Sequence, residues 1–264
     1  MIGRFVTAAV WVALVADPPA FIHEPVESYE ERTVHGFRVL VSAAARANPD
    51  TTDPALRVLE AQLAAVVEVI PPKALGTLRT IPVWVEHMNP DRPCACYHVS
   101  ARWLTANGYL AQKERSVEIS NPVNFVRWVE RTQPWMTLHE LAHGYHDIVF
   151  GYGDASIRAV FEKARDAGLY QRVAYIHGGE QRHYALTNQM EYFAELTEAY
   201  FGRNDFYPFT REELREYDPD GFAMIERCWG VREGRPVESV GDRTSALPEG
   251  FERRWGVPVR RPTR

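Results

Sequence analysis

The sequence has few cysteines, no apolar run of membrane-spanning length and no large excess of either charge. Its three cysteines, Cys94, Cys96 and Cys228, are too few for a disulfide framework. A bridge between Cys94 and Cys96 would be strained because a single residue separates them. Free thiols, or a bridge from one of them to Cys228, are therefore the expected states. A formal net charge of −5 gives no reason to expect a nucleic-acid partner.

Several common signatures are also missing. The chain has no internal repeat, no P-loop and no G-x-S-x-G motif, so nothing points to a repeat protein, a P-loop nucleotidase or an α/β-hydrolase. With 264 residues, 45% of them hydrophobic, the chain is long enough for one large domain with a sizeable core.

The N-terminus predicts export. Arg4 precedes an apolar run over residues 5–16, which is too short for a comfortable membrane span but typical of a signal peptide. Cleavage after Ala16 would leave Leu14 where a small residue is preferred, and a core segment of a cytoplasmic protein is the alternative. The mature chain is expected to be secreted and to have no membrane span.

Four segments are expected. Residues 1–16 form the signal peptide, residues 17–33 a Pro- and Glu-rich linker or arm, residues 34–230 the catalytic domain, and residues 231–264 a loop-like tail rich in Gly, Pro and Arg.

One short motif carries chemistry. His139-Glu140-Leu141-Ala142-His143 reads H-E-x-x-H, and positions i and i+4 lie on one face of a helix. The rings of His139 and His143 can therefore bind one cation, and the Glu140 carboxylate can reach a water bound to it. The same motif also occurs by chance on helices that hold no metal.

A catalytic zinc site needs a third protein ligand. Glu191, Glu195 and Glu198 follow at spacings i, i+4 and i+7 on a second predicted helix, so they share one stripe. Such a stripe is commonly a solvated face. Here aromatic residues surround it, and carboxylates among that much apolar surface need a partner.

At this point the chain resembles a known family. The H-E-x-x-H motif, the segment 184–188 and the helix 191–195 look like the catalytic domain of the anthrax lethal factor type, a gluzincin metallopeptidase, and like related uncharacterised secreted bacterial proteins. The match is specific over residues 139–201 and looser over residues 30–138. It implies an α+β zincin-like fold, with a small mixed sheet packed on helices and the motif on the active-site helix.

The resemblance also implies roles for single residues. Glu191 would be the third zinc ligand, Glu195 an acid that orients a ligand histidine, and Glu198 would lie outside both positions. Tyr184 would stabilise the oxyanion, while Glu140 would take a proton from the zinc-activated water. The expected function is therefore that of a secreted Zn²⁺ metallopeptidase acting on a peptide or protein. A zinc hydrolase of a non-peptide amide, or a non-catalytic metal-binding extracellular protein, are the alternatives.

Periodicity and turn residues place the remaining elements. Thr132 is expected to cap the motif helix, with Pro134 in its first turn and Gly151 at its end, and Asp53 to cap an earlier helix.

Residues 87–98 read as a loop, and residues 117–120 as a strand at the sheet edge or inside the sheet. Residues 170–184 look irregular, with a hairpin as one option. The other expected strands are 37–41 and 81–86, and the other expected helices are 53–70, 75–79, 100–107, 121–129, 155–167, 188–201, 210–217 and 221–229.

Four further histidines have weaker assignments. His146 follows the motif where a metzincin would have glycine, and is expected at the surface or behind the ligands. His98 could line the cleft or lie in a loop. His177 and His183 flank a Gly-Gly turn and could contact substrate.

Overall fold

The computed structural model describes residues 23–89 and 93–231. The predicted signal peptide and residues 232–264 of the predicted tail lie outside the described residues. Within that described part, none of the helices has both the length and the apolar character needed to cross a bilayer.

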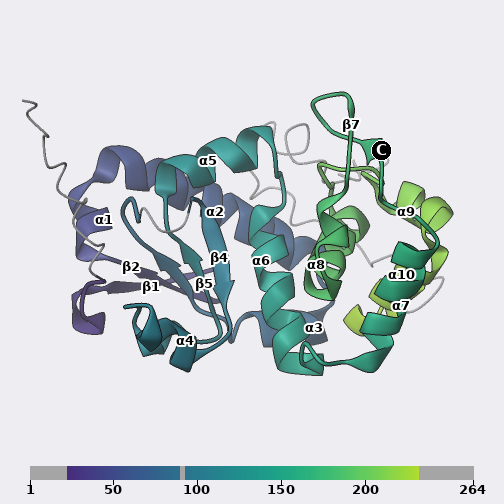
Figure 1. Cartoon of the computed structure of the whole chain (residues 1–264). Helices are drawn as coiled ribbons and strands as arrows, with labels where there is room; N and C mark the ends of the chain where they lie inside the picture. Colours follow the sequence, from purple (N-terminus) through teal and green to yellow (C-terminus); the bar gives the residue numbers. More distant parts are fainter. Residues whose placement is uncertain (1–22, 90–92, 232–264) are drawn as a thin grey trace, which may run out of the picture.

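A five-stranded mixed sheet forms the N-terminal half of the fold (Figure 1). Its order is β1-β2-β3-β5-β4, with the three central strands parallel and both edge strands antiparallel to their neighbours. The strands are β1 (Glu30–Val34), β2 (Phe37–Val41), β3 (Val83–Val85), β4 (Ala95–His98) and β5 (Ser116–Ile119).

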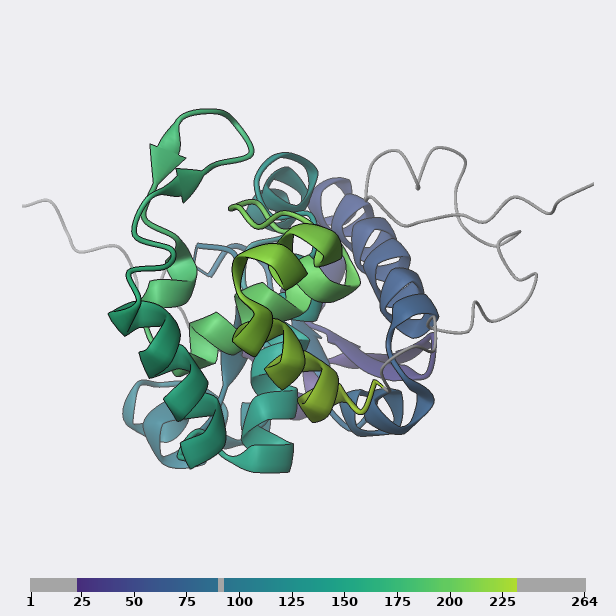
Figure 2. The same ribbon diagram turned by 90° about the vertical axis from the view of Figure 1, so that its right-hand side faces the viewer.

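Ten α-helices complete the described fold. They are α1 (Ala43–Ala47), α2 (Pro49–Val69), α3 (Pro72–Leu78), α4 (Ala101–Ala106), α5 (Pro122–Arg131), α6 (Met136–Tyr145), α7 (Ala155–Asp166), α8 (Gln189–Phe201), α9 (Arg211–Tyr217) and α10 (Pro219–Trp229). A short hairpin, β6 (Val173–Ala174) with β7 (Glu180–Gln181), projects from the domain (Figure 2). The expected α+β class, with a small mixed sheet packed on helices, is confirmed.

The two faces of the sheet have different partners. Val39, Val83 and Val117 share one face and lie in the main core with residues of α2, α3, α5 and α6. Leu40 and Trp84 point to the opposite face, where Tyr29 from the N-terminal segment covers them. Helix α6 lies between the sheet and α8, and α7, α9 and α10 pack beyond α8 (Figures 1 and 2). The motif helix is thus held from both sides.

Local signals fixed many of the boundaries. The strand at residues 37–41 is confirmed at both ends. The Asn121 side chain caps α5, and Thr210 with Glu213 forms the capping box of α9. Gly151, at a φ of 73°, ends the π-helical turn His146–Phe150 that follows α6. A left-handed backbone of this kind suits glycine and stops a helix.

Other boundaries differ from the prediction. Thr132 follows the last turn of α5, so it ends that helix, and α6 begins only at Met136. Helix α2 starts at Pro49, one turn earlier than expected, so that Pro54 lies inside it. Both errors have one cause: a Ser, Thr, Asn or Asp near a proline marks a helix end without saying which helix it belongs to.

Two predicted irregular segments contain strands. Residues 30–33 are not part of an arm, because Glu30–Val34 pairs with β2 as an edge strand. Residues 95–98 are not a loop: they form β4, the opposite edge strand, which pairs with β5. The strand predicted at residues 117–120 is therefore an interior strand, the second of the two options considered.

Candidate metal centre

Three of the expected side chains converge between α6 and α8. His139 Nε2 and His143 Nε2 are 3.1 Å apart, and Glu191 Oε2 lies 3.2 Å from each of them. The two histidines project from consecutive turns of α6. Glu191 lies in the first turn of α8, where the Asn188 side chain accepts hydrogen bonds from two backbone N–H groups. The cap thereby fixes where α8 begins and how Glu191 faces α6.

The spacing of these three atoms suits a small tetrahedral cation. Bonds of roughly 2.0–2.1 Å to a tetrahedral ion place neighbouring ligand atoms roughly 3.3 Å apart. The observed separations of 3.1 and 3.2 Å match this edge length. Two imidazoles and one carboxylate are also the donor set of catalytic zinc sites. The residues present therefore fit zinc, although the geometry alone does not specify the metal.

The charges around the three ligands favour a cation. Burial raises the pKa of Glu191, but its contacts with His139 and His143 outweigh this and hold that pKa well below its usual range. Burial lowers the pKa of His139, but hydrogen bonds with Glu191 and Glu198 outweigh this effect and raise it well above its usual value. In the metal-free protein His139 is thus protonated, and a bound metal would replace that proton as the positive charge beside Glu191.

The acid that orients His139 is not the expected one. His139 Nδ1 donates to Glu198 Oε1 at 2.7 Å, whereas Glu195 Oε1 is 3.7 Å away. Glu198, expected to lie outside the site, also accepts a hydrogen bond from the Gln133 side chain. The assignment of Glu195 as the orienting acid is therefore wrong in this geometry: the shared stripe did not reveal how α8 is rotated against α6.

Glu195 belongs instead to a buried acidic cluster that it forms with Glu198 and Asp205. Oε2 of Glu195 and Oε2 of Glu198 are buried without a hydrogen-bond partner. Burial and the neighbouring Glu198 raise the pKa of Glu195 well above its usual value and that of Asp205 to about 8. Among the described residues, no lysine or arginine forms an ion pair with any of the three. The positive group nearest to the cluster is the ring of His139, 2.7 Å from Glu198 and 3.7 Å from Glu195.

A cleft of about 650 Å³ opens onto the three ligand residues. Glu140 and Tyr184 both line it, so the structure brings all the expected catalytic residues to one cavity. Tyr184 lies in the short 3-10 turn before α8 and is 48% exposed. Burial and the nearby Glu191 raise the pKa of its hydroxyl, which remains a hydrogen-bond donor at neutral pH.

The opposite wall of the cleft comes from β4. Ala95, Cys96 and Tyr97 line the cavity, and β4 has no partner strand on this side of the sheet as described. The sequence did not predict this wall, nor Asp205 and Phe206, which line the same cleft. Strand β4 has only four residues, and the prolines around residues 90–93 are typical of a loop, so the sequence pattern did not predict a strand here.

The remaining histidines do not join the three ligands. His98 is buried on β4 and pairs with Glu118 at 3.0 Å. His146 is buried rather than at the surface, and burial lowers its pKa to about 4. His183 is buried as well, accepts from the backbone of Ala185, and has its pKa lowered to about 3 by burial. His177 is exposed in the hairpin turn and does not line the cleft.

A second group of ligand-type residues already holds a cation of the protein's own. His23, Glu86 and Glu118 lie close enough to share a metal. The buried Lys113 ammonium occupies that position, 3.1 Å from His23 Nδ1, 2.7 Å from Glu118 Oε2 and in contact with Glu86. This group is therefore an internal ion network on the far face of the sheet.

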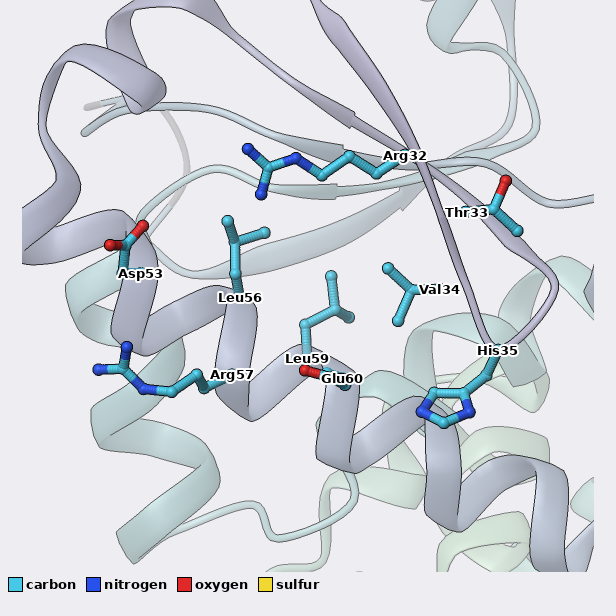
Figure 3. Close-up of a pocket in the computed structure, with 9 residues that line it drawn as sticks. All are labelled: Arg32, Thr33, Val34, His35, Asp53, Leu56, Arg57, Leu59 and Glu60. Atoms are coloured by element: carbon cyan, nitrogen blue, oxygen red, sulfur yellow. The ribbon is translucent and has the colours of Figure 1, made fainter. Parts of the chain in front are cut away.

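The cysteines and a second hollow contribute no ligand to the group formed by His139, His143 and Glu191. Cys94, Cys96 and Cys228 form no disulfide with one another. A second hollow of about 350 Å³ lies between β1 and α2 (Figure 3). Its charged residues are exposed, and Arg32 there is paired with Glu30 at 2.6 Å. It contains none of the candidate catalytic or metal-ligating residues.

No family model, curated protein or solved structure matches the chain.

Proposed function

We propose that the protein is a secreted zinc-dependent metallopeptidase of the gluzincin type, with a zincin-like fold. One observation carries the proposal. The three ligand atoms of His139, His143 and Glu191 lie 3.1–3.2 Å apart at the floor of an open cleft, with Glu140 beside them. A site that only stabilises the fold has no need of a cleft or of a neighbouring general base.

In this proposal the chain's own residues divide the chemistry. His139, His143 and Glu191 hold the ion, which when bound supplies a Lewis acid that makes water a better nucleophile near neutral pH. Glu140 takes a proton from the attacking water and passes it to the leaving amine. The Tyr184 hydroxyl donates to the carbonyl oxygen of the scissile bond as negative charge develops there. Glu198 fixes the ring of His139 through its Nδ1 hydrogen bond.

The edge strand favours a peptide over a small amide as substrate. β4 lines the cleft, and its outer edge, which has no partner strand among the described residues, offers backbone N–H and C=O groups. An extended peptide can add to such an edge as a further strand, which positions its backbone along the row of catalytic residues. A small amide would leave most of this edge unused.

The test combines metal analysis with a matched variant. We expect about one zinc per chain, as one catalytic site requires, and cleavage in a proteome-derived peptide digest. Glu140→Gln keeps the size of the side chain and removes the base, so it should retain zinc and lose turnover. Protein that binds no zinc after reconstitution, or a Glu140→Gln enzyme with full activity, would contradict the proposal. Zinc binding with cleavage of non-peptide amides alone would move the assignment to that class.

Export is tested separately. N-terminal sequencing of protein recovered from the culture medium of its source should begin near residue 17. An intact Met1 on a cytoplasmic pool would contradict secretion without affecting the zinc assignment.

A further inference from the structure

One residue of β4 is hydrogen-bonded to the segment that carries the metal ligands. Tyr97 lies on β4 and lines the cleft, and its hydroxyl donates to Asp147 Oδ2 at 3.0 Å. Asp147 belongs to the π-helical turn that continues α6 shortly after the ligand His143. Burial and the Asp147 carboxylate raise the pKa of the Tyr97 hydroxyl, so it remains a donor at neutral pH. The bond therefore joins the edge strand to the metal-binding helix.

The ring of Tyr97 also packs directly on the backbone of α6, beside which β4 lies (Figure 1). A Cβ atom at Gly144 would lie 2.9 Å from Tyr97 Cε2, closer than side-chain carbons normally approach. Gly144 follows the ligand His143 in the sequence, so the missing side chain lets the strand come close to the ligand itself. Ring contact and hydrogen bond together define where Tyr97 lies relative to His143.

The backbone of the same residue faces the open edge of the sheet. In an antiparallel ladder, successive residues direct their N–H and C=O groups alternately toward and away from the partner strand. The carbonyls of Cys94 and His98 accept hydrogen bonds from the β5 side. Val117, which lies opposite Tyr97 on β5, donates its N–H to Pro82 instead. The N–H and C=O of Tyr97 therefore point away from β5, toward the edge that has no partner strand among the described residues.

We propose that Tyr97 is a positioning residue for extended peptide substrates, because its hydrogen bond to Asp147 sets the distance between the open edge of β4 and the metal ligands. The inference rests on the proposed peptidase function and narrows its substrates to peptides with several residues around the scissile bond. A substrate strand paired with Tyr97 lies at a fixed offset from His143, which places one of its carbonyl groups at the metal. Tyr97 does not touch the reacting atoms and acts through the strand.

The length of the substrate separates this role from the chemistry. An extended peptide of about eight residues spans about 26 Å, enough to pair along the whole of β4, which spans about 13 Å. A blocked dipeptide amide is too short to pair along the strand and depends only on the ligands, Glu140 and Tyr184. Misplacing a bound substrate by roughly 1 Å can cost about 100-fold in rate. Loss of the positioning bond should therefore slow the long peptide far more than the short one.

The experiment measures both substrates with the zinc-loaded full chain, using a scissile bond that is cleaved in the proteome-derived digest. Tyr97→Phe removes only the hydroxyl, and should lower the ratio of the long-peptide kcat to the dipeptide kcat by about 10- to 100-fold, with little change in KM. Asp147→Ala should lower this ratio to a similar extent. Asp147→Asn should lower it less, because an amide oxygen still accepts the hydrogen bond. In the double variant Tyr97→Phe/Asp147→Ala the ratio should fall no further than in either single variant, because both changes remove one bond.

Tyr145→Phe is the matched control. Tyr145 also belongs to α6, but its hydroxyl donates to the Cys228 carbonyl on α10 rather than to the segment beside the sheet. This variant should keep the wild-type ratio. A variant that unfolds in part or loses zinc slows both substrates together, so damage to the fold or to the metal site does not imitate the predicted change in the ratio.

Each outcome has a distinct reading. Cleavage of both substrates with a Tyr97→Phe ratio equal to that of the wild type would overturn the positioning role and leave the peptidase intact. A fall in the ratio that Asp147→Ala does not share would also overturn it, because the hydrogen bond would not be the cause. Wild-type protein that cleaves the dipeptide amide but not the long peptide would overturn the extended-substrate assignment. If the zinc-loaded chain cleaves no peptide at all, the peptidase proposal fails and the positioning role fails with it.

Discussion

The clearest test of the site geometry compares two glutamates on one helix. Glu198 accepts a 2.7 Å hydrogen bond from His139 Nδ1, whereas Glu195 is 3.7 Å from the same atom. Both side chains are almost fully buried, so the change to glutamine makes the same substitution in similarly buried surroundings. Only at Glu198 does it weaken a charged hydrogen bond that orients a ligand.

The magnitude follows from that bond. A hydrogen bond to a charged group contributes about 1.5–3 kcal/mol, which corresponds to roughly 10- to 100-fold in zinc affinity. Losses of this size are usual for partners of a ligand histidine. Glu198→Gln should therefore weaken zinc binding by about this factor, and Glu195→Gln by clearly less. Glu191→Ala removes a ligand and should cost more than either.

Competition with a chromophoric chelator at fixed pH measures all three affinities. Circular dichroism of each metal-free variant controls for folding, so that a loss of affinity is not confused with loss of structure. If Glu195→Gln weakened zinc binding as much as Glu198→Gln or more, the reasoning from the hydrogen-bond distance would be refuted and Glu195 would regain the orienting role.

Three further predictions concern the wall of the cleft, the core and the response to pH. Tyr184→Phe removes one donor to the developing oxyanion and should lower kcat by about 10²–10³-fold with little change in KM; steady-state kinetics with an unchanged kcat would contradict the role. Gly144→Ala should destabilise the fold by about 1–3 kcal/mol, because the new Cβ would lie 2.9 Å from Tyr97 and 2.5 Å from Ile81; urea unfolding measures this, and wild-type stability would show that the neighbours move freely. Burial holds the pKa of His183 at about 3, below its unfolded value of 6.5, so stability is full above pH 6.5 and is lost as pH falls, at about 1.4 kcal/mol per pH unit for this group. Unfolding of metal-free wild type and His183→Asn at pH 7 and pH 5 should show a shallower loss in the variant, and equal losses would contradict it.

Sequence patterns predicted the elements that carry strong local signals. The H-E-x-x-H helix, the aromatic-flanked acidic helix and the capped helices α5 and α9 follow from spacing and caps, which act within a few residues. The edge strand β4 was missed because four residues beside prolines carry too little periodicity. Its place in the sheet depends on pairing with β5, which is a tertiary contact.

Sequence spacing alone did not predict which acid of α8 would bond to His139. Residues at i+4 are rotated by roughly 40° from the first and residues at i+7 by roughly −20°, so all three share a stripe. Glu198 lies two helical turns beyond Glu191. It is closer than Glu195 to the line that runs through Glu191 parallel to the helix axis. The ring of His139 lies along this line, with Nε2 facing Glu191 and Nδ1 facing Glu198. Only the packing of α8 against α6 decides this, and that depends on side chains distant in sequence.

The separation of the ligands along the chain has a consequence for how the molecule assembles. His139 and Glu191 are 52 positions apart, and closing a loop of that size in an unfolded chain costs about 4 kcal/mol of entropy. The three ligands therefore meet only after α6 and α8 have packed together. A bound ion would act as a cross-link between two helices that are distant in the sequence. Its release into a fluorescent zinc indicator would then report, in real time, the moment at which the two helices separate.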